Sequence, residues 1–362
     1  MKIFIHVNAL TGGGAERVAS LWATEFAKRN HKVTVIIRND GRPVTYTPSE
    51  AVKVVRIGPD KGNKVTKYIS RLRQARSLMI KERPDVIIGV LNNATIEAYI
   101  ASRGLGIPVI NTEHNSFERP ESAKMPLSLR FKKMVLNRIY NYVTVLTSAD
   151  KDIAAKHFKH VSLMPNPLAF EPNASEEMIN LKEKIVLASG RIDTWHCKGF
   201  DLLIEAWAKS QHQGWTLKIM GTGAQQSFTL LQNIARKYGV EDSIQFPGYS
   251  TNPLDDYKQA SIFVLSSRYE GFGMVLIEAM SQGCACIAAD YKGRQNEIIH
   301  DTGLAVDTEN ANQIADAITT LINDSQLRKE LQLRAIERSK EYLPSKIGDK
   351  WEVIFQKLKE GK

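Results

Sequence analysis

Short runs of β-branched and aliphatic residues alternate along the chain with longer segments whose apolar positions recur every three or four residues. The apolar runs predict strands at 2–8, 32–38, 53–57, 85–91, 108–114, 142–148, 161–166, 184–190, 215–221, 243–248, 261–267, 284–290 and 303–307. The periodic segments predict helices at 14–29, 66–82, 93–103, 122–140, 200–210, 224–238, 274–282, 294–299, 309–323, 325–340 and 346–359. Strands that alternate with helices are typical of βαβ units, so we expect an α/β fold of parallel sheets covered by helices on both faces.

The length and one break in this pattern predict two domains. At 362 residues the chain exceeds the size at which a single core usually stops growing. The break is the stretch 165–177, which holds three prolines and two asparagines and suits a linker. We therefore expect two Rossmann-like, doubly wound domains, 1–168 and 169–343, that face each other across a cleft with ligands beyond the carboxyl ends of the strands. The amphipathic C-terminal segment 344–360 either caps the second domain or packs back on the first.

The composition is that of a soluble globular protein, with 43% hydrophobic and 24% charged residues. Its three cysteines show no disulfide framework, which favours a reducing compartment. The N-terminus lacks the apolar core of a signal peptide, and no apolar run is long enough to span a membrane. We expect a cytoplasmic protein.

Three adjacent glycines, Gly12, Gly13 and Gly14, separate the first predicted strand from the first helix. Glycines let backbone N–H groups approach an anion, and the N-terminus of a helix adds partial positive charge. The spacing does not match a dinucleotide fingerprint, whose third glycine would fall at Arg17. The loop therefore favours a phosphate contact and disfavours an NAD-dependent oxidoreductase.

Two cations flank one loop at the start of the second domain. Arg191 follows a predicted strand, and Lys198 comes seven residues later, just before a helix. Fixed cations at such a position stabilise the charge that develops on a departing nucleoside diphosphate without a metal ion. The chain has no DxD motif and no His/Asp cluster, so we expect no metal and no other cofactor.

Two carboxylates, Glu270 and Glu278, bracket the turn between a predicted strand and a helix that begins near Gly273 or Met274. Eight residues of helix would separate them by about 12 Å, whereas the catalytic pair of a retaining glycosidase lies roughly 5–5.5 Å apart. We infer that they hold two ends of one elongated ligand, Glu270 at sugar hydroxyls and Glu278 at a ribose. The peptide groups of Gly271, Phe272 and Gly273 would meet the diphosphate and sugar between them.

The motifs GGGAER, GRID…KGFDLLIEA, GTG and EGFGMVLIEAM together resemble those of the retaining glycosyltransferases of family 4, which have the GT-B fold. The resemblance covers nearly the whole chain. It implies that Arg191 and Lys198 contact the donor diphosphate, and that Glu270 holds the donor sugar and Glu278 the ribose. It also implies that Gly13 and Gly14 pack against phosphate and acceptor, and that Gly221, Thr222 and Gly223 line the base and ribose. The chain departs from the family pattern by inserting Trp195, His196 and Cys197 beside the lysine.

The activity that the resemblance implies is transfer of a hexosyl or N-acetylhexosaminyl group, with retention, from a nucleotide sugar. We expect a UDP-sugar as donor, and a glycan or polyprenyl diphosphate-linked saccharide in envelope polysaccharide biosynthesis as acceptor. His114, at a strand end of the first domain, is the candidate to steer the acceptor hydroxyl. The alternatives are a GDP-mannose-dependent mannosyltransferase and a nucleotide-sugar epimerase of the same fold.

Positive charge is concentrated in the first half of the chain. Residues 1–180 hold 27 Lys and Arg against 16 Asp and Glu, a balance of +11, whereas the rest hold 22 against 23, a balance of −1. The basic segments 61–83 and 119–138 predict peripheral association with the anionic inner face of the cell membrane. Within the second segment Arg130, Lys132, Lys133 and Arg138 alternate with apolar residues. Nucleic-acid binding is disfavoured because Tyr68 is the only aromatic residue of 61–83.

Overall fold

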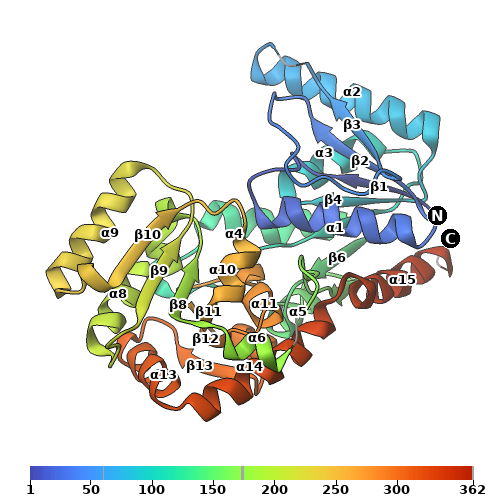
Figure 1. Cartoon of the computed structure of the whole chain (residues 1–362). Helices are drawn as coiled ribbons and strands as arrows, with labels where there is room; N and C mark the ends of the chain where they lie inside the picture. Colours follow the sequence, from blue (N-terminus) through green and yellow to red (C-terminus); the bar gives the residue numbers. More distant parts are fainter. Residues whose placement is uncertain (60, 173–174, 361–362) are drawn as a thin grey trace. The chain divides into compact units, whose positions relative to one another are not determined.

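The computed structural model describes residues 1–59, 61–172 and 175–360, and the chain divides into two compact units (Figure 1). Unit 1 consists of the described residues of Met1–Phe117, Met125–Pro167 and Pro344–Lys362. Unit 2 consists of the described residues of Glu118–Lys124 and Leu168–Leu343. Each unit is an α/β domain with its own parallel sheet, as the alternation of apolar runs and amphipathic segments predicted.

Unit 1 contains a parallel sheet of seven strands in the order β3-β2-β1-β4-β5-β6-β7, counted over its described residues. The strands are β1 (Lys2–His6), β2 (Lys32–Arg38), β3 (Lys53–Ile57), β4 (Val86–Val90), β5 (Val109–Thr112), β6 (Tyr142–Val145) and β7 (Val161–Leu163). The helices are α1 (Gly14–Lys28), α2 (Lys64–Glu82), α3 (Asn92–Ser102), α4 (Leu127–Leu136), α5 (Ser148–Ala155) and α15 (Pro344–Glu360), with a short 3₁₀ turn η2 (Asn137–Ile139). The strand order reverses between β1 and β4, which creates a switch point at their carboxyl ends.

Unit 2 contains a parallel sheet of six strands in the order β10-β9-β8-β11-β12-β13, again over the described residues. The strands are β8 (Glu183–Ser189), β9 (Thr216–Met220), β10 (Ile244–Gly248), β11 (Ala260–Leu265), β12 (Ala285–Asp290) and β13 (Gly303–Asp307). The helices are α6 (Glu176–Asn180), α7 (Trp195–Lys198), α8 (Phe200–Lys209), α9 (Gln225–Tyr238), α10 (Pro253–Gln259), α11 (Met274–Ser281), α12 (Arg294–Ile299), α13 (Ala311–Asn323) and α14 (Ser325–Ser339). Short 3₁₀ turns are η1 (Glu121–Ala123), η3 (Ile192–Thr194), η4 (Glu241–Ser243) and η5 (Lys340–Tyr342). Here the switch point lies between β8 and β11.

The C-terminal helix α15 belongs to unit 1, where it lies beside α1 (Figure 1). The ring of Trp351 meets the ring of Trp22 edge-on at a centroid distance of 5.1 Å and that of Phe26 at 5.7 Å. Phe355 packs on Phe26 at 5.3 Å. All four side chains are buried. The sequence left two placements open for this segment, and in the structure it packs back on the first domain.

One predicted helix, 122–140, is broken in the structure. Pro126 has no N–H to continue a helix, so the chain forms the short turn η1, then α4 from Leu127, then η2. The sequence also left α5 and α10 unpredicted. On α4 and η2 four apolar side chains spaced four residues apart are exposed, and we call them the apolar ridge: Leu127 (79% exposed), Phe131 (67%), Val135 (38%) and Ile139 (37%).

Within the described residues, every helix is too short or too polar to cross a lipid bilayer.

Candidate active site

An ion pair lies at the switch point of unit 2. The ammonium Nζ of Lys198 is 2.6 Å from Oε1 of Glu270, and the hydroxyl of Ser267 donates to the same oxygen at 2.7 Å. Burial alone would lower the pKa of Lys198, but the attraction and the hydrogen bond of Glu270 outweigh burial and leave that pKa raised. Both side chains keep some contact with solvent, 22% for Lys198 and 14% for Glu270. The structure thus joins two predicted site residues that are 72 positions apart.

The loop between β8 and α8 folds so that Lys198 returns to the end of β8. The loop forms η3 and then the single helical turn α7, which contains the inserted residues, and Trp195 packs against the core of unit 2. Gly199 then ends the turn with φ +65°, where a Cβ would lie 2.0 Å from the carbonyl oxygen of Ser266. The Lys198 side chain passes over Gly190, whose missing Cβ would be 3.2 Å from Cδ and Cε of the lysine. The insertion therefore carries Lys198 back beside Arg191.

Arg191 itself is exposed, and its guanidinium makes no hydrogen bond or ion pair with the described residues. It follows Gly190 directly and lies near enough to Lys198 for their charges to interact. A cation in this state is free to bind an incoming anion.

Arg268 is a residue of this site that the sequence reading passed over. Its guanidinium binds both carboxylate oxygens of Asp201 at 2.8 Å and Oε1 of Glu309 at 3.2 Å, and its backbone N–H donates to the Cys197 carbonyl. The Ser266 hydroxyl donates to the Lys198 carbonyl at 2.9 Å. These contacts fasten α7 to the turn after β11, so they position Lys198 against Glu270. The only sequence signal is an arginine directly after an apolar strand, and that pattern does not distinguish a buried positioning residue from a surface charge.

The loop of Gly221, Thr222 and Gly223 supports the same corner of unit 2. Gly221 approaches β8 so closely that a Cβ would lie 1.7 Å from the carbonyl oxygen of Gly190. The N–H of Ile192 donates to the Thr222 carbonyl at 2.8 Å, and a Cβ on Gly223 would lie 2.6 Å from Cβ of Ile192. A side chain at Gly221 or Gly223 would collide with Gly190 or Ile192, so both glycines are needed for this loop to pack against the segment that carries Arg191.

The second carboxylate of the predicted pair lies deeper in unit 2. Glu278 is on α11 and 3% exposed, and the hydroxyl of Tyr257, on α10, donates to its Oε2 at 3.2 Å. Gly271 and Phe272 lead into α11, which begins at Met274 after Gly273 with φ +85°. The Phe272 ring is buried against Tyr342, so its side chain is not available to a ligand.

No group of three or more His, Cys, Asp or Glu side chains is gathered in metal-binding proximity within the part of the chain that the structure describes.

In unit 1, His114 follows β5 and lies against the ring of Trp22, at a centroid distance of 5.7 Å. The Thr112 hydroxyl donates its one proton to the Gly89 carbonyl, so the contact of 3.0 Å between Thr112 and Nε2 of His114 requires the proton on Nε2. Nδ1 is then an acceptor, and it has no partner in the described residues. Burial lowers the pKa of His114 to about 4, so the ring is neutral at pH 7.

The loop that carries His114 is held by a buried ion pair. Oε2 of Glu113 is 3.1 Å from Nζ of Lys133, which also donates to the carbonyls of Asn115 and Ser116. Lys133 is 2% exposed. The expectation that Lys133 contributes to a basic membrane-facing surface is therefore wrong, because this ammonium stabilises the 113–116 loop from inside.

The glycine loop of unit 1 already faces a carboxylate. α1 begins at Gly14, and a Cβ on Gly13 would lie 2.3 Å from Oε2 of Glu16, in the first turn of the helix. A phosphate at Gly13 and Gly14 would have to displace that side chain, because two anions do not share one helix N-terminus.

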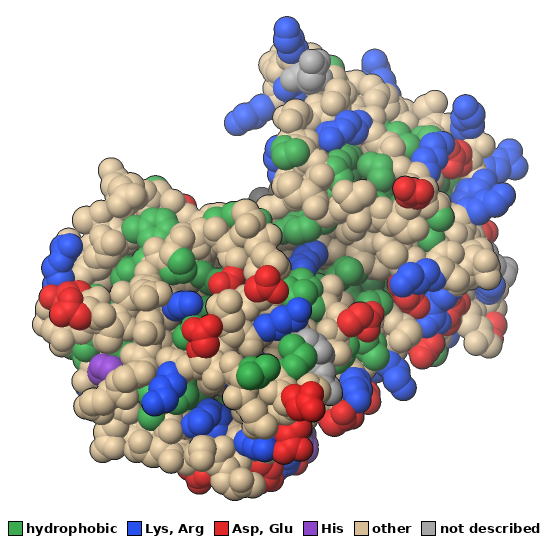
Figure 2. All heavy atoms as spheres, viewed as in Figure 1, with side chains coloured by type: hydrophobic (Ala, Val, Ile, Leu, Met, Phe, Trp, Pro, Cys, Tyr) green, Lys and Arg blue, Asp and Glu red, His purple; other side chains and the backbone are tan. Residues whose placement is uncertain are grey.

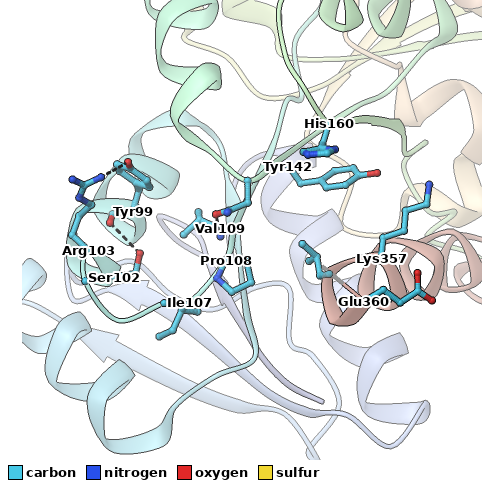
Figure 3. A pocket seen from close by; sticks show the side chains of 14 residues that line it. Tyr99, Ser102, Arg103, Ile107, Pro108, Val109, Tyr142, His160, Lys357 and Glu360 are labelled. Carbon is cyan, nitrogen blue, oxygen red and sulfur yellow. Dashed lines mark hydrogen bonds between the residues drawn. The ribbon is translucent and has the colours of Figure 1, made fainter. Parts of the chain in front are cut away.

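A cavity of about 770 Å³ in unit 1 lies away from these strand ends (Figure 3). Val109 and Tyr142, the first residues of β5 and β6, line it together with His160, which directly precedes β7, and Lys357 of α15. It therefore opens at the amino-terminal edge of the sheet, opposite the edge that holds His114 and the glycine loop.

Comparisons with known proteins cover the whole chain. The family model described as Glycosyltransferase Family 4 matches residues 12–171, and that of Glycosyl transferases group 1 matches residues 170–340. The amylovoran biosynthesis glycosyltransferase AmsD of Erwinia amylovora is 30% identical over 364 residues, 98% of this chain and 99% of that protein. A Campylobacter jejuni enzyme named GalNAc-alpha-(1->4)-GalNAc-alpha-(1->3)-diNAcBac-PP-undecaprenol alpha-1,4-N-acetyl-D-galactosaminyltransferase is 28% identical over 99% of each chain.

Solved structures show the same fold at lower identity. A sucrose-phosphate synthase from Thermosynechococcus elongatus superposes with a TM-score of 0.83 at 19% identity and covers 100% of both chains. Anabaena HepE, in complex with UDP and glucose, gives a TM-score of 0.78 at 20% identity over 99% of this chain and 100% of that one. Two parallel-sheet domains of this kind define the GT-B fold. On the full-length match to AmsD and the two family models, the chain is a glycosyltransferase and belongs to glycosyltransferase family 4.

Proposed function

We propose that the enzyme transfers a hexosyl or N-acetylhexosaminyl group, with retention, from a nucleotide sugar to a saccharide acceptor of envelope polysaccharide or lipid-linked oligosaccharide synthesis. The observation that carries the proposal is the Lys198–Glu270 pair beside Arg191 at the switch point of unit 2. Ligands of doubly wound sheets bind at such points. Two cations there suit a diphosphate, and a carboxylate suits sugar hydroxyls.

The relatives support the chemical class of both substrates. HepE was solved with UDP and glucose, and a Staphylococcus aureus TarM variant with UDP and a GlcNAc-glycerol. These complexes favour a UDP-sugar as the donor. The Campylobacter jejuni relative is named for an acceptor linked to undecaprenol through a diphosphate, and AmsD for the biosynthesis of the polysaccharide amylovoran. They favour a saccharide acceptor, lipid-linked or polymeric.

The proposed step is a displacement on one face of the donor sugar. The acceptor oxygen bonds to the anomeric carbon while the bond from that carbon to the leaving phosphate oxygen breaks, and the acceptor proton passes to that phosphate oxygen. Arg191 and Lys198 stabilise the charge on the leaving diphosphate. Glu270 holds the donor sugar, and Nδ1 of His114 accepts a hydrogen bond from the acceptor hydroxyl.

A nucleotide screen tests the donor site. A ligand that binds the folded state raises the unfolding temperature, so we expect UDP to raise it more than GDP or ADP, and Lys198→Ala to abolish most of the rise. A larger rise with GDP would identify a GDP-sugar donor instead. No rise with any nucleotide would contradict the proposed function.

We further propose that the apolar ridge of α4 and η2 binds the surface of an anionic membrane. Four apolar side chains on one line are exposed, and the exposed Lys124, Arg130 and Arg138 accompany them in the chain. Lys and Arg side chains also project around the part of unit 1 that carries α2 (Figure 2). Apolar insertion flanked by basic residues is the composition of an interfacial helix.

A further inference from the structure

A second charged cluster lies at the other switch point, in unit 1. His6 and Arg38 are the last residues of β1 and β2, and the register of these strands, His6 opposite Ile36, puts both side chains on the face covered by α2 and α3. Arg71 of α2 and Glu97 of α3 complete the cluster. None of these four residues belongs to the candidate donor site of unit 2.

Two guanidinium groups share one carboxylate in this cluster. Nη2 of Arg38 is 2.7 Å from Oε1 of Glu97, and Arg71 binds the same carboxylate through Nη2 at 2.8 Å and Nε at 3.1 Å. Burial, against the opposing pull of Glu97, lowers the pKa of His6 to about 4, so this ring adds no charge at pH 7. The cluster therefore carries one excess positive charge. Glu97 is 3% exposed, whereas Arg38 remains 24% and Arg71 14% exposed.

Several unsatisfied polar atoms belong to the cluster or to residues at the same strand ends. Buried side-chain atoms without a hydrogen-bond partner in the described residues include Nε of Arg38, both ring nitrogens of His6 and the amide oxygens of Asn8 and Asn92. Asn8 follows β1, and its carbonyl accepts from the N–H of Arg38 at 3.1 Å. Asn92 begins α3, directly after β4, the other neighbour of β1. Buried polar groups are nearly always satisfied in folded proteins, so such a concentration indicates a site for a ligand.

The unsatisfied atoms also indicate what that ligand offers. Nε of Arg38 is a donor and needs an acceptor, which an anionic group supplies with the geometry that guanidinium prefers. The amide oxygens of Asn8 and Asn92 need donors, which sugar hydroxyls supply. Both asparagines are half-buried, so part of each residue is accessible to a ligand.

We propose that the Arg38–Arg71–Glu97 cluster of unit 1, with Asn8 and Asn92, binds a saccharide that carries an anionic group, and that it selects such saccharides as acceptors. The inference rests on the proposed function, since it describes the acceptor of that reaction. The anion is either a phosphate or the carboxylate of a uronic acid, because both accept a pair of hydrogen bonds from guanidinium. If Arg38, Arg71 and Glu97 served only to join α2 and α3 to the sheet, the cluster would need no excess positive charge. Nor would it need the unsatisfied amide oxygens of Asn8 and Asn92.

Binding to the UDP-saturated protein tests the cluster, because UDP then fills the donor site. The probes are glucose, glucose 6-phosphate and glucuronate, titrated by calorimetry. We expect at least one of the two anionic sugars to bind tenfold more tightly than glucose, and the stronger of them identifies the anion. Asn8→Asp, which is isosteric and adds a negative charge, is expected to lower the affinity for that sugar at least tenfold, and Arg38→Gln is expected to do the same. Arg73→Ala, which removes an exposed arginine of α2, is the matched control and is expected to bind as the wild type does.

The outcomes separate this inference from the proposed function. Equal binding of all three sugars, or an anion preference that survives in both Asn8→Asp and Arg38→Gln, would overturn the cluster as an acceptor site. UDP is expected to stabilise the wild type and these variants alike, because the donor site lies in unit 2. Failure of UDP to stabilise even the wild type would instead contradict the donor site. Asn8→Asp leaves the ion pairs intact, so it remains informative if Arg38→Gln does not fold.

Discussion

The position of Lys198 depends on the lack of a side chain at Gly190 and at Gly221. Its methylene groups cross the space that a Cβ of Gly190 would narrow, and Gly221 leaves room for the Gly190 carbonyl. The sequence indicated Lys198, Arg191 and Glu270 because they were predicted at strand ends, beyond which ligands of doubly wound sheets bind, and because together they suit a diphosphate and a sugar. It did not indicate that Glu270 pairs with Lys198, since a contact across 72 residues depends on which strands are neighbours in the sheet.

Glu270→Gln is expected to lower kcat/KM about 10- to 100-fold. The substitution removes the charge that orients Lys198 and replaces a charge-assisted hydrogen bond, a loss of about 1.5–3 kcal/mol. Steady-state kinetics with a UDP-sugar measure the effect. Ser267→Ala, which removes only the second donor to Oε1, is the control and should cost less than tenfold. A Glu270→Gln enzyme within twofold of the wild type would rule out the proposed role of this carboxylate.

Chelation of divalent metal ions is expected to leave activity unchanged, because in the proposed mechanism Arg191 and Lys198 supply the positive charge at the diphosphate. Initial rates after dialysis against EDTA, with and without added Mg²⁺ or Mn²⁺, are the measurement. Loss of activity that either ion restores would show that these two side chains are insufficient.

His6 predicts a loss of stability in acid. Its pKa is lowered to about 4 in the folded protein, against 6.5 for an ordinary histidine. Below about pH 6.5 the unfolded chain binds a proton that the folded chain refuses, so the free energy of unfolding falls as the pH drops from 6.5 to 4. The limiting slope is about 1.4 kcal/mol per pH unit. In denaturant titrations from pH 7.5 to 4.5, the free energy of unfolding should decline less steeply for His6→Gln than for the wild type. The decline for His157→Gln, which changes an exposed histidine, should equal that of the wild type. Equal slopes in all three would refute this assignment.

Lys133 shows where reasoning from single residues fails. A lysine in a basic, amphipathic segment normally lies in solvent, and its burial depends on Glu113, twenty positions earlier in the chain. Nothing in the local pattern marks it, because Arg130 and Arg138 share its neighbourhood and are exposed.

At the scale of elements, the apolar runs of the chain locate the described strands, although β6 and β7 each end three residues before the predicted runs do. β2 and β3 begin and end where the apolar runs do. β2 is buried and needs a continuous apolar sequence, whereas β3 is an edge strand and keeps several of its residues exposed. The prediction of one helix at 122–140 was wrong because Pro126 interrupts the segment, although the apolar periodicity continues on both sides of the proline. The four-residue spacing of the apolar ridge survives that break.

Removing the ridge is expected to release the protein from membranes. Leu127→Ser combined with Phe131→Ser should reduce flotation with vesicles containing anionic lipid at least tenfold, since each large apolar side chain contributes about 1.5–3 kcal/mol when it leaves water. The control is Leu181→Ser, which changes an equally exposed leucine of unit 2. Wild-type protein that fails to float at low salt would contradict the membrane proposal, and unchanged flotation of the double variant would contradict the role of the ridge.

At the scale of the molecule, the alternation of strands and helices was sufficient to predict two parallel-sheet domains, because βαβ connections leave few other arrangements. The destination of the last helix was not predictable. Its apolar face indicates that it packs against another element, and the structure shows that this element is α1.

Trp351→Ala is therefore expected to destabilise the protein by about 3–5 kcal/mol, the usual cost of removing a fully buried aromatic side chain, and to do so by loosening unit 1. Thermal unfolding followed by circular dichroism measures the loss. Val353→Ala changes an exposed residue of the same helix and should cost little. A Trp351→Ala protein as stable as the control would show that α15 does not support unit 1.

The membership of α15 in unit 1 also sets an order of events during synthesis. Trp22 and Phe26 leave the ribosome more than three hundred residues before the side chains of α15 that cover them. Unit 2, whose sheet is complete at Asp307, has all its strands available before that cover exists. Unit 1, whose sheet is translated before that of unit 2, therefore completes its core only after the strands of unit 2 have been made, and until α15 emerges the rings of Trp22 and Phe26 lack that cover.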